Sequence, residues 1–199
     1  MDSAKTGVSE LAESNLEIFC RQVRKRSSEN RKARALLHRN ALTGSVVSIL
    51  RQELDSMVRC IFLLSIADNE YRMKLLADSV SGKLWRTKDD KSRVTDREMV
   101  DLANRLHGWT RNVYAFGCGF IHLSALHDYA DRDPLAQLAP QDRKEIALYL
   151  RNYHGVAMDE DTTFRDIEAV LPAVFEKISS NLECELQDLE RGAALVEDE

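Results

Sequence analysis

Apolar residues recur at intervals of three or four along most of this chain, and this spacing places them on one face of a helix. The pattern predicts an all-α fold, a bundle of five to six long helices in a single domain. The predicted helical segments cover residues 9–40, 45–67, 68–81, 95–130, 140–155 and 164–191.

The first two predicted segments differ in how much of their surface is apolar. In segment 9–40, the stretch from Arg24 to Arg34 is almost wholly polar, so the segment is either one long solvated helix or two helices. Segment 45–67 is apolar on nearly every side in its latter half, which is typical of a helix at the centre of a bundle. The charged residues 83–94, which include Trp85, are predicted to form an exposed loop.

Segment 95–130 has the clearest start signal in the chain. Thr95 and Glu98 match a capping box, in which each side chain accepts a hydrogen bond from the other residue's backbone amide. Apolar residues then recur with a helical period, and we predict one continuous helix that contains Gly108. In the last segment, 164–191, Pro172 lies inside the predicted helix and should bend it.

Composition supports long elements in one ordered domain. Only eight Gly and three Pro occur in 199 residues, and so few turn residues argue against many short strands. An apolar share of 44% excludes a wholly disordered chain. We assign the helical bundle to residues 9–192 and expect disorder at residues 1–8 and in the acidic tail 193–199.

The sequence carries no signal for export, membrane insertion or metal binding. Residues 1–7 lack the apolar core of a secretory signal, and the longest apolar stretch, residues 57–67, is shorter than the roughly 20 residues that span a bilayer. The four Cys residues are scattered, without metal-ligand or redox spacing. We therefore expect a cytoplasmic protein with reduced thiols and without a membrane partner, a bound metal or another cofactor.

Charge is distributed unevenly along the chain. Residues 21–40 carry a net charge of +7, whereas residues 158–199 carry −10. Three interpretations of the basic segment stay open: it contacts RNA phosphates, it pairs with the acidic end of this chain or of a partner chain, or it is a solvated helix face. The candidate nucleic-acid-binding residues are Arg24, Lys25, Arg26, Arg31, Lys32 and Arg34.

A second face of the predicted helix 95–130 lies opposite its large apolar residues. At 100° per residue this face combines Arg111 and His122 with small residues, namely Ala115, Cys118, Gly119 and Ala125. Small side chains let another helix approach closely, so this face should contact a helix of the same chain or of a second copy in a homodimer. In an antiparallel homodimer, His122 would approach Arg111 of the other copy. His127 falls on the core side and is predicted to be a buried histidine.

Asp55 and Arg59 form a second constellation, in the predicted central helix. They are spaced i,i+4, which brings their side chains together on one face. An unpaired Arg would be costly in a largely buried helix, so Asp55 is its natural partner. The pair is either a structural ion pair or a ligand site in which Arg59 faces an anion.

Residues 114–124 place a tyrosine, small residues, an apolar pair, a histidine and a serine on one predicted helix, from Tyr114 through His122 to Ser124. This pattern resembles the HEPN superfamily and related abortive-infection helical families. The resemblance implies an all-α bundle, frequent homodimers and, in active members, a metal-independent RNase. It matches His122 to the family histidine, and Arg111 with Asn112 to an Arg–polar pair that acts with it on the RNA 2′-OH and the scissile phosphate.

Two functional hypotheses follow. In the first, a HEPN-like protein of bacterial defence cleaves or binds RNA, with His122 as general acid/base, Arg111 on the phosphate, and Tyr114 and Asn112 as ligand contacts. In the second, the chain is a non-catalytic helical interaction or dimerisation module that binds a protein partner.

Overall fold

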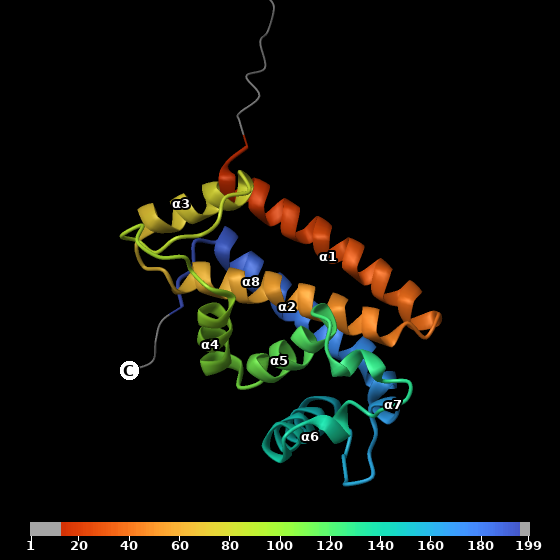
Figure 1. The fold of residues 1–199 in the computed structure, drawn as a ribbon. Coiled ribbons are helices and arrows are strands. Elements are labelled where there is room, and N and C mark those ends of the chain that lie inside the picture. Colours follow the sequence, from red (N-terminus) through yellow and green to blue (C-terminus); the bar gives the residue numbers. More distant parts are fainter. Residues whose placement is uncertain (1–12, 196–199) are drawn as a thin grey trace, which may run out of the picture.

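The structure, a computed structural model, describes residues 13–195. These residues fold into a bundle of helices, and β-pairing among them is confined to one bridge between Arg86 and Arg93. The predicted all-α class is therefore confirmed. The α-helices (Figure 1) are α1 (Asn15–Arg39), α2 (Thr43–Ser65), α3 (Asn69–Val80), α4 (Asp96–His107), α5 (Thr110–Ile121), α6 (Pro140–His154), α7 (Phe164–Ile167) and α8 (Leu171–Glu190). The short 3-10 helices are η1 (Ala125–Asp128), η2 (Leu135–Gln137) and η3 (Glu168–Val170).

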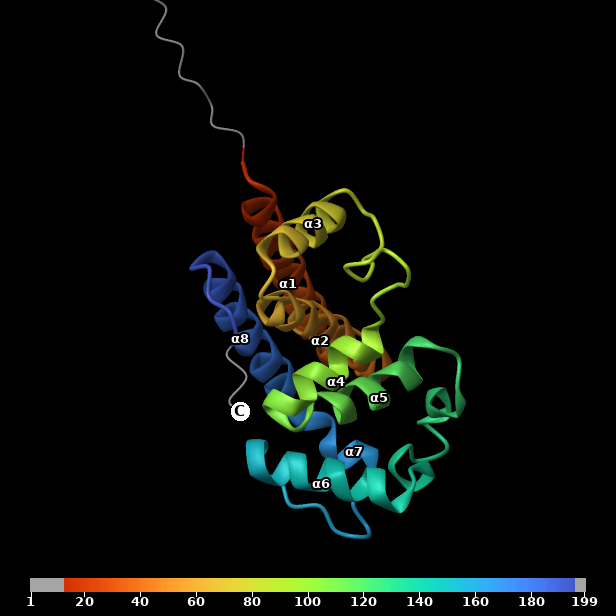
Figure 2. The ribbon, with the colours of Figure 1, turned by 90° about the vertical axis from the view of Figure 1, so that its left-hand side faces the viewer.

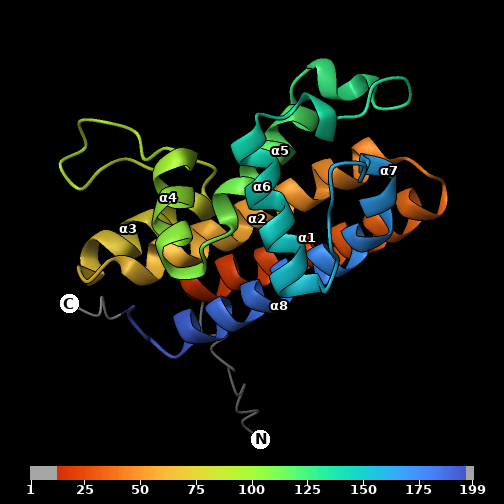
Figure 3. The ribbon, with the colours of Figure 1, turned by 90° about the horizontal axis from the view of Figure 1, so that it is seen from below.

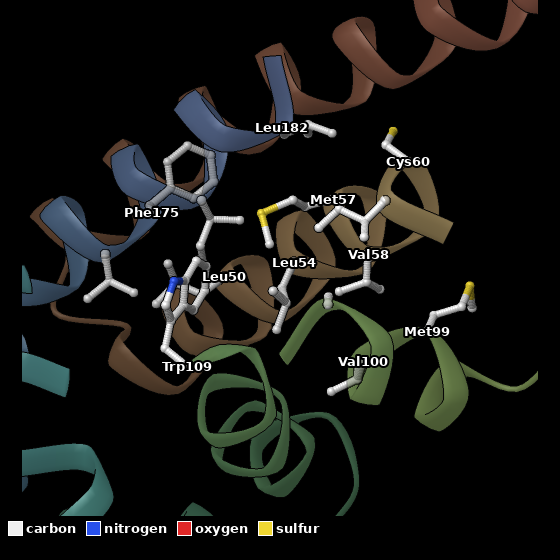
Figure 4. Close-up of a cluster of buried hydrophobic side chains, with 14 of the residues drawn as sticks. Leu50, Leu54, Met57, Val58, Cys60, Met99, Val100, Trp109, Phe175 and Leu182 are labelled. Carbon is white, nitrogen blue, oxygen red and sulfur yellow. The ribbon is translucent and has the colours of Figure 1, made fainter. Parts of the chain in front are cut away.

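Helix α2 is the centre of the bundle, as its apolar surface predicts. Helices α1, α4, α5 and α8 all pack on it. Leu54 and Met57 of α2 are fully buried, among side chains of α4 and α8 such as Val100 and Phe175 (Figure 4). Each large apolar side chain buried in this way contributes roughly 1.5–3 kcal/mol, so α2 and its neighbours supply most of the stability of the core.

Helix α1 is one continuous helix, which settles the choice between one helix and two. It runs beside α2 and α8 (Figures 1 and 3). It begins with a capping box, in which the Glu17 N–H donates to Ser14 Oγ at 3.3 Å and the Ser14 N–H donates to the Glu17 carboxylate at 2.7 Å. Its polar middle stays helical because those side chains bind neighbouring helices: Asn30 is buried and donates to Glu53 of α2 at 2.9 Å. The predicted start at residue 9 lies outside the described residues.

The predicted continuous helix 95–130 is wrong, because the chain turns at Gly108. Helix α4 does begin with the predicted capping box, with the Thr95 N–H 2.6 Å from the Glu98 carboxylate. It ends at His107, and Gly108 has φ 72°, the left-handed conformation that terminates many helices.

Helix α5 restarts two residues later and ends at Ile121, well before the expected end near residue 130. Trp109, at the turn, is only 2% exposed. The apolar period continues across the turn because α4 and α5 both bury one face against α2. The periodicity therefore predicted the buried faces of α4 and α5 correctly, but it wrongly predicted that they form one continuous helix.

The C-terminal half contains one confirmed helix and one that is divided. Helix α6 begins at Pro140 and ends at His154, before Gly155, whose φ is 67°, as predicted. It lies on the far side of α5 from α1 (Figures 1 and 2). The predicted helix 164–191 is divided into α7, η3 and α8. Pro172 does not bend a helix but lies in the first turn of α8, where its missing N–H costs no helical hydrogen bond.

Residues 83–94 lie outside the α-helices, but Trp85 is not exposed as predicted. It is 4% exposed, its ring stacks on Phe62 of α2 at a centroid distance of 5.9 Å, and its indole N–H donates to Ser79 Oγ at 2.8 Å. The local charge around Trp85 suggested exposure, whereas contacts with α2 and α3 bury its ring.

The described end of the chain is hydrogen-bonded to the bundle. The Leu195 N–H donates to the Leu64 carbonyl at 3.0 Å, and the Ala193 carbonyl accepts from Arg72 at 3.3 Å. Disorder was expected at residues 1–8 and 193–199. Residues 1–8 and 196–199 lie outside the described residues. Across residues 13–195 no helix is both long and apolar enough to cross a membrane.

Candidate functional site

Arg111 and His122 do not form a joint site within one copy of the chain. Arg111 lies in the first turn of α5 and His122 follows its last residue, so about 16 Å of helix separates them. The Arg111 guanidinium pairs with Asp101 of α4, with Nη2 2.9 Å from the carboxylate oxygen. His122 is exposed, and its ring makes no hydrogen bond with another described residue.

The small-residue face of α5 is covered in part by the same chain. A Cβ on Gly119 would lie against a methyl group of Leu126 of η1. Gly117, on the apolar side of α5, is packed as closely, since an added Cβ would lie 2.8 Å from the Cβ of Arg51 of α2. Ala115 and Ala125 stay exposed. Packing within the chain thus explains Gly119, the glycine of this face, without a second copy.

His127 is exposed rather than buried as predicted. The helix that would carry it to the core has already ended at Ile121, and His127 lies in η1 instead. Its Nδ1 accepts a hydrogen bond from the Ser124 N–H at 3.3 Å, in a capping arrangement. His127 therefore stabilises the start of η1.

The strongest side-chain constellation, the arginine cluster, joins α2 to α4 and α5. Asp55 lies between two arginines of its own helix, 3.5 Å from Arg51 Nη1 and 3.4 Å from Arg59 Nε. Asp96, in the first turn of α4, is 2.9 Å from Arg59 Nη2 and 3.8 Å from Arg51 Nη2. The Asp55–Arg59 ion pair expected from the i,i+4 spacing is confirmed. Asp96 and Arg51 were missed, although Arg51 also stands four residues from Asp55.

Arg51 is the most buried member of the arginine cluster, with 6% of its side chain exposed. Its guanidinium carbon lies 3.8 Å from the centre of the Tyr114 ring, a cation–π contact. Burial opposes the charge, but a hydrogen bond with Cys118 and the attraction of Asp55 outweigh burial, so the pKa of Arg51 is raised. Burial also raises the pKa of Tyr114, against the pull of Arg51. Tyr114, a predicted ligand contact, is therefore part of a structural contact with Arg51.

The inner side of the basic segment pairs with the acidic end of this same chain, one of the three interpretations left open. Arg24 binds two carboxylates of α8, Glu183 at 2.9 Å and Glu190 at 2.5 Å. Hydrogen bonds from Arg24 hold the pKa values of both carboxyl groups below their usual range. Arg31 and Arg34 share Glu176, at 3.3 and 2.9 Å. Three of the six candidate nucleic-acid-binding residues, Arg24, Arg31 and Arg34, therefore join α1 to α8.

The outer side of α1 carries a different set of cations, which we call the outer row: Arg21, Lys25, Lys32 and Arg39. All four are exposed, and at 100° per residue they fall within about 40° of one another on the helix. Arg21 pairs with Glu13 at 2.7 Å, whereas the ammonium groups of Lys25 and Lys32 form no ion pair with a residue in 13–195. The row extends over about 27 Å.

Asn112, the remaining predicted ligand contact, lies in an apolar cleft between α6 and the rest of the bundle. The cleft has a volume of about 60 Å³, and its other lining residues, such as Phe116, Tyr149 and Ile167, come from α2, α5, α6, α7 and α8. The predicted ligand residues are thus divided between this cleft, the Tyr114–Arg51 contact and the Asp55–Arg59 pair. Among the described residues no group of three or more His, Cys, Asp or Glu side chains is arranged to hold a metal ion.

Three features are therefore candidate binding sites: the outer row of α1, the partly exposed Arg59–Asp96 side of the arginine cluster, and the apolar cleft between α6 and the rest of the bundle. Neither protein-family models nor curated proteins nor solved structures give any match to this chain. The resemblance of residues 114–124 to the HEPN superfamily stays a prediction, and function is argued from charge and geometry.

Proposed function

We propose that this chain binds RNA without cleaving it, through the outer row of α1. The observation that carries the proposal is the division of the basic segment into two sides. Arg24, Arg31 and Arg34 face α8 and are neutralised there, whereas Lys25 and Lys32 point to solvent on a straight helix. Cations in a row on one rigid helix suit a phosphate backbone, which supplies most of the affinity in sequence-independent binding.

Binding without cleavage is favoured by the positions of Arg111 and His122. A general acid/base must lie within hydrogen-bond reach of the reacting group, directly or through one water. In one copy, Arg111 is held by Asp101 and His122 lies at the other end of α5. The outer row needs no second copy to present its charges.

The test is salt-dependent RNA binding, measured by fluorescence anisotropy with duplex and single-stranded RNA of equal length. The double variant Lys25→Gln/Lys32→Gln should lower the slope of log K against log salt by about 0.7–0.9 for each phosphate contact removed. The control, Lys83→Gln/Lys144→Gln, makes the same charge change elsewhere and should leave the slope unchanged. Equal losses in both variants, or no RNA binding at low salt, would contradict the proposal. Binding of an acidic polypeptide but not of RNA would assign the row to a protein partner.

The second candidate is the HEPN-like, metal-independent RNase of bacterial defence. One observation favours it: Arg111 and His122 are both exposed, so a second copy could reach them. It requires a homodimer in which His122 of one copy meets Arg111 of the other. RNA cleavage in chelator that disappears in His122→Ala, together with a dimer in solution by light scattering, would support it. Cleavage that survives the substitution would exclude His122 as the catalytic residue.

A further inference from the structure

A groove between α1, α2 and α3 combines two arginines with neutral hydrogen-bond donors. It has a volume of about 200 Å³, well above the roughly 10–15 Å³ that a cavity needs to hold one water. The polar lining residues are Gln22, Arg26, Ser56, Arg59 and Ser79, and the apolar ones are Phe19 and Val23. The groove is thus large enough for a tetrahedral oxyanion.

The two guanidinium groups of the groove use only some of their N–H donors within the chain. Among residues 13–195, Arg26 makes a single hydrogen bond, from Nη1 to Ser56 Oγ at 3.2 Å, and its ion pair with Asp55 is 3.8 Å long. Arg59 uses Nε toward Asp55 and Nη2 toward Asp96, and its guanidinium lies 5.3 Å from the centre of the Trp85 ring. Both arginines therefore keep N–H donors for an anion, and the ring helps to hold Arg59 in place.

Charge in the arginine cluster is unbalanced where it borders the groove. Arg26, Arg51 and Arg59 share two carboxylates, those of Asp55 and Asp96. One positive charge is left over, and two of the three arginines, Arg26 and Arg59, line the groove. A bound anion would restore the balance.

The neutral groups of the groove complement an oxyanion as well. Ser79 Oγ already accepts the Trp85 indole N–H at 2.8 Å, so its own proton is free to be donated. The Gln22 amide adds two further donors and takes part in no hydrogen bond with a residue in 13–195. Phe19 and Val23 add apolar surface to the lining.

We propose that this groove binds the phosphoryl group of a small soluble phosphate ester. Paired arginine forks match the oxygen geometry of a phosphoryl group, and hydroxyl and amide donors complete the set. This site goes beyond RNA binding by the outer row and does not depend on it, because it uses Arg26 and Arg59 rather than Lys25 and Lys32. A phosphorylated RNA end offers the same chemistry and is the second source to distinguish.

Isothermal titration calorimetry of the full chain tests the site, with inorganic phosphate and a nucleoside 5′-monophosphate as probes and sodium chloride at matched ionic strength as the blank. Arg26→Gln should weaken binding by about tenfold or more, the loss of one charge-assisted contact. Ser79→Ala should weaken it several-fold. The matched control is Lys144→Gln, which removes an exposed cation of α6 that does not line the groove, and it should bind phosphate like the parent.

Two further measurements keep the result clear. Arg26→Lys keeps the charge but loses the fork, so it should bind more tightly than Arg26→Gln and less tightly than the parent. RNA of one sequence, with a 5′-phosphate or a 5′-hydroxyl, separates the sources: a preference for the phosphate that Arg26→Gln abolishes assigns the groove to RNA ends.

Phosphate binding that is absent at millimolar concentration, or that is equal in the parent, Arg26→Gln and Ser79→Ala, would overturn the proposal. Circular dichroism of each variant separates lost binding from lost folding. RNA binding by the outer row can fail or succeed independently, because Lys25→Gln/Lys32→Gln leaves the groove intact.

Discussion

Two sets of arginine–carboxylate pairs hold this bundle together, and they differ in burial. Between α1 and α8, Arg24 and its partners Glu183 and Glu190 have 36–44% of their side chains exposed. In the arginine cluster, Arg51 and Asp55 are 6% and 19% exposed. The first set forms in contact with water and salt, whereas the second replaces water with Tyr114, Cys118 and the backbone of α5.

The comparison shows that an arginine–carboxylate pair can be a surface contact that depends on pH and salt, or a buried contact that is part of the core. Exposed ion pairs are screened and typically contribute about 0–1 kcal/mol. Removing one partner of a buried pair typically costs about 3–5 kcal/mol, because the remaining charge stays desolvated. Three substitutions test whether this chain follows the same division, in order of expected effect.

The largest effect is expected at Arg51. Arg51→Met keeps much of the side-chain volume but removes the cation that pairs with Asp55 and contacts the Tyr114 ring. Asp55 keeps Arg59 as a partner, so the free energy of unfolding should fall by about 3 kcal/mol, the lower end of that range. Urea denaturation followed by circular dichroism measures it. Arg24→Met is the matched exposed control and should cost less than about 1 kcal/mol. Similar losses in the two variants would remove the distinction between the sets.

An intermediate effect is expected at Gly117, which faces Arg51. On a free helix surface, Gly→Ala stabilises by up to about 1 kcal/mol. Here the added Cβ would lie 2.8 Å from the Cβ of Arg51, so Gly117→Ala should instead destabilise the fold by about 1–3 kcal/mol. The shift of the thermal unfolding midpoint shows whether Gly117→Ala stabilises or destabilises the fold. The double variant Gly117→Ala/Arg51→Gly, which removes the contacting Cβ, should lose less stability than the sum of the two single losses, and strictly additive effects would show that the two residues do not touch.

The smallest effect is expected at Arg24, and it should depend on pH and salt. The folded-state pKa values of Glu183 and Glu190 are lowered, so their contribution to stability is present above the unfolded pKa, about 4.3, and is lost as pH falls through the folded values. At pH 7 and low salt, Arg24→Gln should therefore be less stable than the parent by up to about 1 kcal/mol. The difference in free energy of unfolding between the parent and Arg24→Gln should shrink below about pH 4 and in 1 M salt. A difference that stays constant with pH would mean that the two carboxylates do not contribute to it.

The sequence predicted the fold class and the buried helix faces because both follow from local periodicity. It predicted the Asp55–Arg59 pair for the same reason, since four residues make one helical turn. It did not predict Asp96 as the second partner of Arg59, because that contact joins residues far apart in the chain. The burial of Trp85 depends in the same way on Phe62 and Ser79.

The candidate site was harder to predict because one residue changes the geometry of the whole segment. Gly108 is compatible with a helix interior, at a cost, and also with a left-handed helix end, and the surrounding pattern fits both. In the structure it ends α4, so the single helix on which Arg111, His122 and His127 were aligned does not exist. For the basic segment the sequence left several partners open, and the packing of α8 on α1 shows that Arg24, Arg31 and Arg34 pair with carboxylates of the same chain.

The packing of α8 on α2 also has a consequence for synthesis of the chain. Helix α2 is complete at Ser65, but α8, which covers one of its apolar faces, begins only at Leu171, more than 100 residues later. At about 5–20 residues per second, a ribosome needs roughly 5–20 s to make that intervening stretch. During that time the nascent chain exposes an apolar face of its central helix. We expect chaperones to bind the nascent chain until α8 has been synthesised.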